Sequence, residues 1–170
     1  MTNLHAPRVR VFLANYNDEL HANAVVQLLD AYARDPAGGG HGLSAFAKSN
    51  LIAELAKRPH AFSVLACDVT DHGETPVGLV NCIEGFSTFA CKPLVNVHDV
   101  VVLASHRGQR VGEQMLSLAE KIAVQRGACK LTLEVLSGNA GAVKLYERFG
   151  FAKYQLDPAM GSALFLQKWL

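Results

Sequence analysis

The sequence contains no apolar run close to the roughly 20 residues that a helix needs to span a bilayer. It also has little net charge, because 16 Lys and Arg residues nearly balance 15 Asp and Glu residues and leave a formal charge of +1. This balance favours neither a nucleic-acid partner nor a membrane surface. Residues 1–7 lack a basic region followed by an apolar stretch, so we expect no signal peptide and a cytoplasmic location.

Paired cysteine motifs are absent as well. The four cysteines show no C-x-x-C spacing and lie in or near apolar segments, which favours reduced core thiols over a disulfide or a metal site; they are Cys67, Cys82, Cys91 and Cys129. The sequence has no internal repeat and no low-complexity segment. With 170 residues, half of them hydrophobic, the chain can bury about 70% of its unfolded surface. We therefore expect a single domain over residues 1–170 without a metal.

The apolar periodicity predicts alternating strands and helices. Strands are expected near residues 8–13, 62–67, 77–84, 94–103, 131–136, 151–154 and 163–169. Helices are expected near residues 18–34, 44–57, 111–125 and 139–149. Glycines at residues 38–40 and 42 predict a flexible loop over residues 35–42. The resulting order, β-α-α-β-β-β-α-β-α-β-β, predicts an α/β fold.

A glycine-bearing turn joins the strand over residues 94–103 to the following helix. It reads His-Arg-Gly-Gln-Arg-Val-Gly over residues 106–112. The first N–H groups of a helix lack internal partners and carry partial positive charge, and glycine lets a phosphate approach them. Arg107 and Arg110 add charge to the turn. Its spacing matches neither the P-loop nor the dinucleotide fingerprint. We expect it to bind a phosphate-bearing cofactor, with a ligand-free turn as the alternative.

A second motif reads as a short capped helix over residues 139–151. Asn139 is a suitable N-cap, and Gly150 is a suitable residue to end the helix in the left-handed region. One helical face carries four apolar side chains, namely Ala142, Leu145, Tyr146 and Phe149.

Both motifs resemble signatures of the GNAT superfamily of N-acetyltransferases. The first resembles the R-G-x-G-[IV]-G turn, which seats the pyrophosphate of coenzyme A, through Arg107, Gly108, Val111 and Gly112. Arg110 stands where the family usually has glycine, and we expect an ordinary helical φ at this position. The second motif meets every fixed position of the pattern N-x-x-A-x-x-L-Y-x-x-x-G-F. The two signatures also occur in the expected order.

The resemblance implies a GNAT fold with a mixed, mostly antiparallel sheet of about seven strands and about four helices. In that family strands four and five splay apart, and the pantetheine arm of acetyl-CoA lies between them. Backbone groups of two valines on the long strand would bind this arm. The implied cofactor-binding set is Val100, Val102, Arg107, Gly108, Gln109, Arg110, Val111, Gly112, Asn139, Ala142 and Tyr146.

Acetyl transfer to an amine requires a base for the amine, a donor for the oxyanion and an acid for the thiolate. By resemblance, the N–H near Val100 would hold the oxyanion. On an unbroken strand, Asn96, His98, Val100 and Val102 share one face and Asp99 points to the other. Only one of His98 and Asp99 can then face the substrate, unless a bulge intervenes.

Three side chains are candidates for catalysis. His98 could take the proton of the amine, or be a half-buried strand histidine that bonds a neighbour. Asp99 could orient His98 or Arg107, attract a cationic substrate, or cap a backbone group. Tyr146 matches the acid of many relatives, because a phenol with a pKa of about 10 suits a thiol leaving group; a core aromatic is the alternative.

We therefore expect an acetyl-CoA-dependent N-acetyltransferase that acts on a small primary amine by direct attack. A non-catalytic acyl-CoA-binding or sensing module is one alternative, and a protein lysine or N-terminal acetyltransferase is another. Homodimers are common in the family, although nothing in the residues establishes one here. The expected partner is thus a small amine, with no nucleic acid and no membrane, and a homodimer stays open.

Overall fold

The computed structural model describes residues 8–154, 157, 159, 161 and 163–170. The chain divides after Leu136 into two compact units, Met1–Leu136 and Ser137–Leu170, and each is described by itself. The single domain expected over residues 1–170 stays a prediction. The expectation about a signal peptide concerns residues 1–7, which lie outside the described part.

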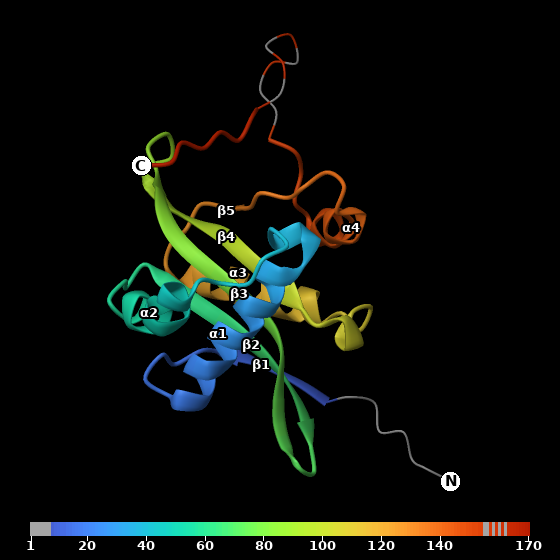
Figure 1. Cartoon of the computed structure of the whole chain (residues 1–170). Coiled ribbons are helices and arrows are strands. Elements are labelled where there is room, and N and C mark those ends of the chain that lie inside the picture. Colours follow the sequence, from blue (N-terminus) through green and yellow to red (C-terminus); the bar gives the residue numbers. More distant parts are fainter. Residues whose placement is uncertain (1–7, 155–156, 158, 160, 162) are drawn as a thin grey trace. The chain divides into compact units, whose positions relative to one another are not determined.

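The first unit is built on a five-stranded sheet in the order β1-β2-β3-β4-β5 (Figure 1). Its strands are β1 (Arg8–Leu13), β2 (Ala61–Thr70), β3 (Gly73–Ser87), β4 (Lys92–Val102) and β5 (Leu131–Thr132). The first four strands pair antiparallel in sequence order, and β5 pairs parallel to β4. The hairpin expected around residues 71–73 is confirmed, because β2 ends at Thr70 and β3 begins at Gly73.

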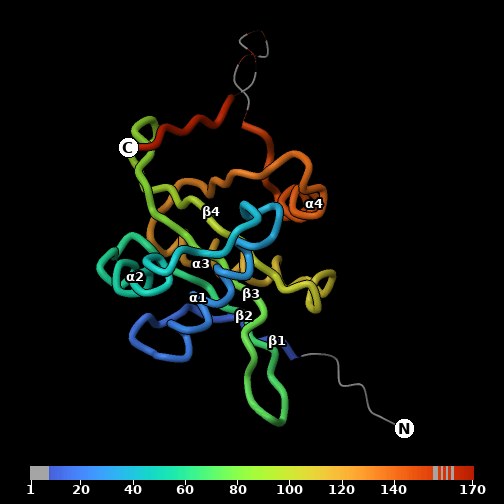
Figure 2. Tube along the Cα trace, in the orientation of Figure 1, coloured from blue at the N-terminus to red at the C-terminus, as the bar shows by residue number. Residues whose placement is uncertain are grey.

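Helices α1 (Glu19–Arg34) and α2 (Ala45–Ala56) lie on one face of this sheet (Figure 2). A side chain caps each helix, as Asp18 accepts from the backbone of His21 and Ser44 accepts from that of Ala47. The buried cluster beneath α1 contains Ala24, Val25, Leu28, Leu65, Leu79 and Val101. The predicted loop over residues 35–42 contains a 3-10 turn, η1 (Pro36–Gly38).

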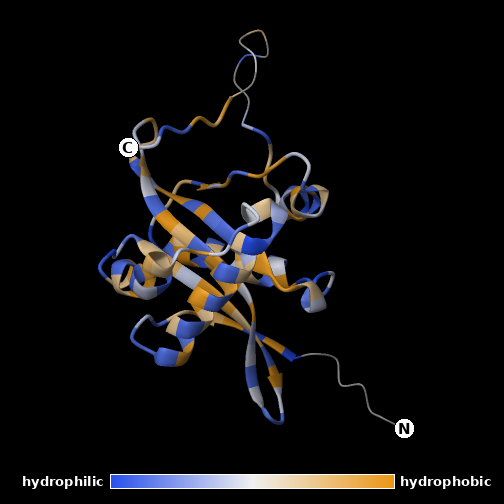
Figure 3. Ribbon diagram, viewed as in Figure 1, coloured by the Kyte–Doolittle hydropathy of each residue, from blue (hydrophilic) through white to orange (hydrophobic). Residues whose placement is uncertain are grey.

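Helix α3 (Val111–Gln125) covers the other face and buries a stripe at helical spacing, which includes Val111, Met115, Leu116, Ala119 and Ala123. It packs closely on the sheet, since a Cβ built on Gly78 of β3 would lie 2.9 Å from the Met115 Cε. A second 3-10 turn, η2 (Ala104–His106), links β4 to this helix. Apolar residues are concentrated on the strands between the two helical layers (Figure 3). No helix in the described residues is long and apolar enough to cross a membrane.

The second unit contains helix α4 (Ala140–Phe149). Asn139 accepts a hydrogen bond from the Ala142 N–H at 3.2 Å, and Gly150 ends the helix with a φ of 101°. Both predicted caps are therefore confirmed. Past the cap, the Phe151 N–H donates to the Tyr146 carbonyl at 2.9 Å.

The strand count is a correction, since the described residues contain five strands rather than about seven. The strand expected over residues 131–136 is paired only at Leu131–Thr132. Residues 151–154 and 163–169, also expected as strands, have no regular secondary structure. Apolar alternation shows that a segment can lie on a sheet, but a strand also needs a neighbour to pair with.

The cysteines divide into two kinds. Cys67 and Cys82 are buried and unpaired, as expected, whereas Cys91 and Cys129 are exposed rather than in the core. Burial raises the pKa of the Cys67 thiol, and it raises that of Cys82 to about 12. The two core thiols are therefore protonated and unreactive near neutral pH.

Candidate functional site

A β-bulge in β4 determines which side chains share a face. Asp99 pairs with Asn81 of β3, but the next residue of β3, Cys82, pairs with Val97. His98 is thus the extra residue of β4, and the register shifts around it. The bulge that the sequence left open is present.

The bulge overturns the unbroken-strand assignment of faces. Asn96 pairs with Ile83 and Asp99 pairs with Asn81, two residues of β3 that share a face. The His98 Nδ1 lies 3.3 Å from the Asn96 Oδ1. Asn96, His98 and Asp99 therefore all lie on the face covered by α1, and none shares a face with the side chains of Val100 and Val102.

The amide of Asn96 orients the His98 ring. Its Nδ2 donates to the Thr132 Oγ1 at 3.2 Å and to the Glu134 carboxylate at 3.3 Å. Its Oδ1 is then the atom that accepts from the Nδ1–H of His98. In the neutral ring this leaves Nε2 as the basic nitrogen. His98 is exposed, so this lone pair is accessible to a substrate.

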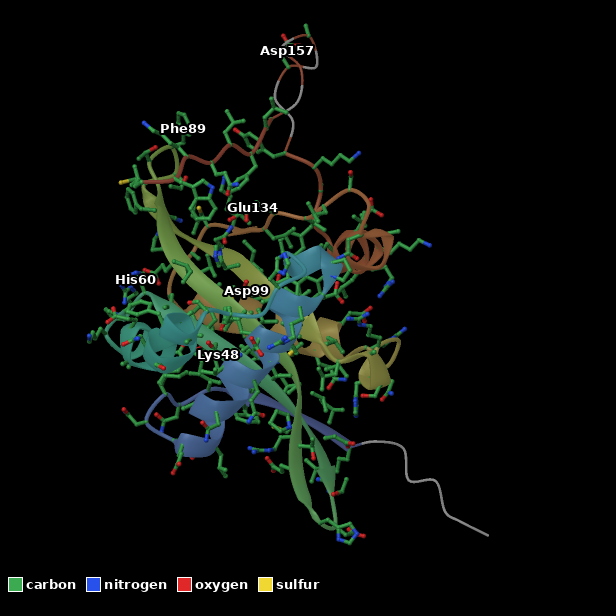
Figure 4. The ribbon with its side chains drawn as sticks, viewed as in Figure 1. Lys48, His60, Phe89, Asp99, Glu134 and Asp157 are labelled. Carbon is green, nitrogen blue, oxygen red and sulfur yellow. The ribbon has the colours of Figure 1, made fainter. Side chains whose placement is uncertain are left out.

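Asp99 is held by a residue of β3, whereas the contacts of Asn96 are made on the β5 side of β4. The Asn81 Nδ2 donates to the Asp99 Oδ2 at 3.0 Å. Its negative charge also acts on Tyr32 of helix α1. Burial raises the pKa of the Tyr32 phenol, and the charges of Asp99 and Asp35 raise this pKa further. Figure 4 labels Asp99 on β4 and Glu134 on the segment that follows β5. Two carboxylates therefore flank the His98 bulge.

The pairing between β4 and β5 ends close to this bulge. The two strands pair only at Val95–Leu131 and Asn96–Thr132. Within the described residues, no strand pairs the β5 side of β4 beyond Asn96. The family resemblance implied such a separation of strands four and five.

Backbone groups of β4 point toward this unpaired side. The Leu103 N–H donates to the Val77 carbonyl of β3 at 2.9 Å. Because successive residues of a strand direct their N–H and C=O groups to opposite sides, those of Val100 and Val102 point away from β3. These are the backbone groups that the family resemblance assigns to the cofactor.

The turn over residues 106–112 leads into the N-terminus of α3. Asp18, Ser44 and Asn139 cap the other three α-helices through their side chains, but the N-cap of α3 makes no such bond. The amides of Val111 and Gly112 therefore lack both a side-chain cap and an intrahelical acceptor. Gly108 has a φ of 79° and open space around its Cα. These features fit the diphosphate of a cofactor.

Side chains brace the turn against the rest of the first unit. The Arg107 Nε donates to the Val102 carbonyl at 3.0 Å, and its Nη2 lies 3.4 Å from the Asp35 Oδ2. The His106 Nε2 lies 3.3 Å from the Asp68 Oδ2 of β2. Arg107 thus contacts the glycine-rich loop, not Asp99 as the sequence allowed. The turn is preformed.

Arg110 contradicts the expected helical φ. It is the N-cap of α3 and adopts the left-handed conformation, with φ 59° and ψ 19°. Its side chain is 82% exposed, with its Nε 3.9 Å from the Glu113 carboxylate. A left-handed residue with a Cβ costs roughly 1–2 kcal/mol. The turn imposes the conformation that the family's glycine would adopt without strain.

Arg110→Gly is therefore expected to stabilise the protein by about 1 kcal/mol, which raises the melting temperature by about 2–4 °C in a chain of this size. Calorimetry without cofactor measures the change. Arg110→Ala is the control, because it removes the guanidinium but keeps the strained Cβ. Equal stabilisation by both variants would show that charge, not backbone strain, is responsible.

The second unit holds the remaining predicted site residues. Tyr146 is the buried residue of α4, and its ring packs edge-on against Phe151 at 5.9 Å between centroids. Asn139 and Ala142 form the N-terminal cap. The predicted site residues on β4 and in the turn before α3 thus belong to the first unit, and those on α4 belong to the second.

Sequence reasoning missed three polar residues. The sequence patterns singled out none of them; they are Glu134, Ser63 and Asn81. Ser63 and Asn81 are buried in the sheet, with 1% and 6% of their surface exposed. Polar side chains amid the apolar runs of the two expected strands were the available signal.

Comparisons with known proteins agree with the resemblance. Residues 25–151 match the model of the Acetyltransferase (GNAT) family. The streptothricin acetyltransferase of Streptomyces lavendulae is 36% identical over 87 residues, which are 49% of this chain and 46% of that protein. The chain thus spans about half the length of this curated relative.

Solved structures share the fold. A probable acetyltransferase superposes with a TM-score of 0.76 at 19% identity, over 94% of this chain and 98% of that one. AAC(6')-Iy in complex with the bisubstrate analogue CoA-S-monomethyl-acetylneamine superposes with a TM-score of 0.71 at 17% identity, over 96% and 99%. At these identities the likeness establishes the α/β fold.

Proposed function

Because this chain belongs to the GNAT acetyltransferase family, we propose that it moves the acetyl group of acetyl-CoA to a primary amine of a small, positively charged molecule. Acetyl-CoA-dependent acetyl transfer follows from the family. The small cationic acceptor and the roles of single residues are the proposal. Its main support is the His98 bulge, which brings an imidazole and a carboxylate onto one face beside the unpaired edge of β4.

The phosphate end of the cofactor is assigned to the turn before α3. The uncapped amides of Val111 and Gly112 would hold the diphosphate, and Gly108 leaves room for it. Gln109 and Arg110 lie in the same turn, and Arg110 adds an exposed cation. Backbone groups of Val100 and Val102 would hold the pantetheine arm, with Asn139 and Ala142 of the second unit contributing as the family signature implies.

The acceptor is assigned to the α1 face of β4. A protonated amine is attracted by carboxylates, and Asp99 and Glu134 supply two of them around His98. A molecule with several amines could engage one carboxylate with a spectator ammonium and present another amine for reaction. The streptothricin acetyltransferase to which the chain is similar is named for a small-molecule substrate.

His98 would take the proton from the amine through Nε2, after which the nitrogen attacks the acetyl carbonyl. The N–H of Val100 would donate to the oxyanion. As the C–N bond forms and the C–S bond breaks, Tyr146 would give its proton to the departing sulfur. We propose direct attack, and an acyl intermediate on Cys82 is disfavoured because burial raises the pKa of this thiol to about 12.

The decisive assay measures release of free CoA from acetyl-CoA with a panel of acceptors. We expect turnover with polyamines and amino sugars, and kcat/KM at least tenfold lower with amines of similar size that carry a carboxylate. Lysine-containing peptides and protein N-termini form the second arm, since protein acetylation is the alternative. If only peptides or protein N-termini are acetylated, the acceptor is a protein and not a small amine. If no amine is acetylated, the proposal is overturned. A cytoplasmic location and a homodimer remain predictions.

A further inference from the structure

A row of polar side chains crosses three strands on the α1 face. Ser63 of β2 is aligned with Asn81 of β3, which is aligned with Asp99 of β4. The adjacent row on the same face consists of Leu65, Leu79 and Val101, which belong to the core beneath α1. Burying polar groups beside such a core is costly unless they bond to one another.

The hydrogen bonds in this row all have the same direction. The Ser63 hydroxyl donates to the Asn81 Oδ1 at 2.6 Å, and the Asn81 Nδ2 donates to the Asp99 Oδ2 at 3.0 Å. The Tyr16 hydroxyl lies 2.8 Å from the Ser63 Oγ. Since Ser63 has a single hydroxyl hydrogen, Tyr16 is the donor in that contact. Every donor therefore points toward Asp99.

We propose that Asn81, supported by Ser63 and Tyr16, is a positioning residue that fixes the carboxylate of Asp99 to receive the ammonium group of the acceptor. The bond to Oδ2 fixes the rotamer of Asp99. Its Oδ1 has no other partner among the described residues and is left for the substrate. This inference rests on the proposed function, which assigns the acceptor to this face.

This row of hydrogen bonds acts by orienting and polarising Asp99 rather than by transferring a proton. The side-chain amide of Asn81 does not ionise near neutral pH, so it cannot pass a proton from Ser63 to Asp99. Bonds aligned in one direction polarise one another and strengthen the last donor. A well-oriented carboxylate binds a cation equally in the ground and transition states, so its loss changes KM more than kcat.

The test is a double-mutant cycle between Asn81→Leu and Asp99→Asn, with kinetics measured separately for the amine and for acetyl-CoA. We expect Asn81→Leu to raise the KM for a diamine about tenfold, with kcat changed less than threefold and the KM for acetyl-CoA unchanged. Ser63→Ala should raise the amine KM about threefold, because the bond from Asn81 to Asp99 remains. In the double variant, adding Asn81→Leu to Asp99→Asn should change KM less than twofold.

A matched control separates positioning from loss of stability. Val64 is fully buried beside Ser63 but faces α3, so Val64→Ala should lower the melting temperature without changing the amine KM. Multiplicative effects in the cycle, or an equal KM rise in Val64→Ala, would overturn the inference while leaving the proposed function intact. A wild-type chain that acetylates no amine would overturn both.

Discussion

Replacing His98 by alanine is expected to lower kcat/KM for a strongly basic amine by about 10²- to 10³-fold. An alkylamine with a pKa of about 10.4 is almost fully protonated at pH 7, so its neutral form costs about 4–5 kcal/mol. The base that removes this proton must be accessible and correctly oriented. His98 is exposed on the bulge of β4, and Asn96 holds its Nδ1.

The dependence on acceptor basicity distinguishes a base from a binding residue. A weakly basic amine is already neutral at the assay pH and does not need His98. With such an amine, the loss of kcat/KM in His98→Ala should therefore be less than about tenfold. His98→Gln keeps a donor toward Asn96 but has no basic nitrogen, and it should be as slow as the alanine variant. His72→Ala, at the exposed turn between β2 and β3, is the matched control. A deficit independent of acceptor basicity would remove His98 from the role of base.

Local signals in the sequence were sufficient for the four α-helices and for both caps of α4. Asp18, Ser44 and Asn139 each bond an amide within the next three residues, so the pattern lies in a few consecutive positions. The antiparallel strands and the turn before α3 were likewise predicted, because apolar alternation and glycine placement are local. These elements determine the fold class and the candidate cofactor turn.

Features that depend on two strands at once were not predictable in this way. The bulge at His98 exists only in the register between β3 and β4, and no pattern within β4 marks it. The same holds for Ser63 and Asn81, which meet Asp99 only when three strands align. The helical φ expected at Arg110 was wrong for a related reason. Tertiary context imposes a positive φ, which the backbone preference of a residue with a Cβ disfavours.

Tyr146→Phe is expected to lower kcat about 10²-fold with little change in the KM for the amine. The substitution removes only the phenol oxygen, so the edge-on packing against Phe151 is kept. If the hydroxyl gives its proton to the departing sulfur, its loss affects the transition state rather than binding. Steady-state kinetics with acetyl-CoA and a diamine measure the effects on kcat and on KM separately.

The leaving group provides the sharper test of Tyr146. An oxygen ester analogue of acetyl-CoA expels an alkoxide, which is far more basic than a thiolate and depends more strongly on an acid. The deficit of Tyr146→Phe should therefore be larger with the oxygen ester than with the thioester. Tyr154→Phe, the same change at an exposed residue outside α4, should leave both rates unchanged. A deficit equal for the two donors would mean that Tyr146 supports α4 through packing, and the proton for the thiolate must then come from elsewhere.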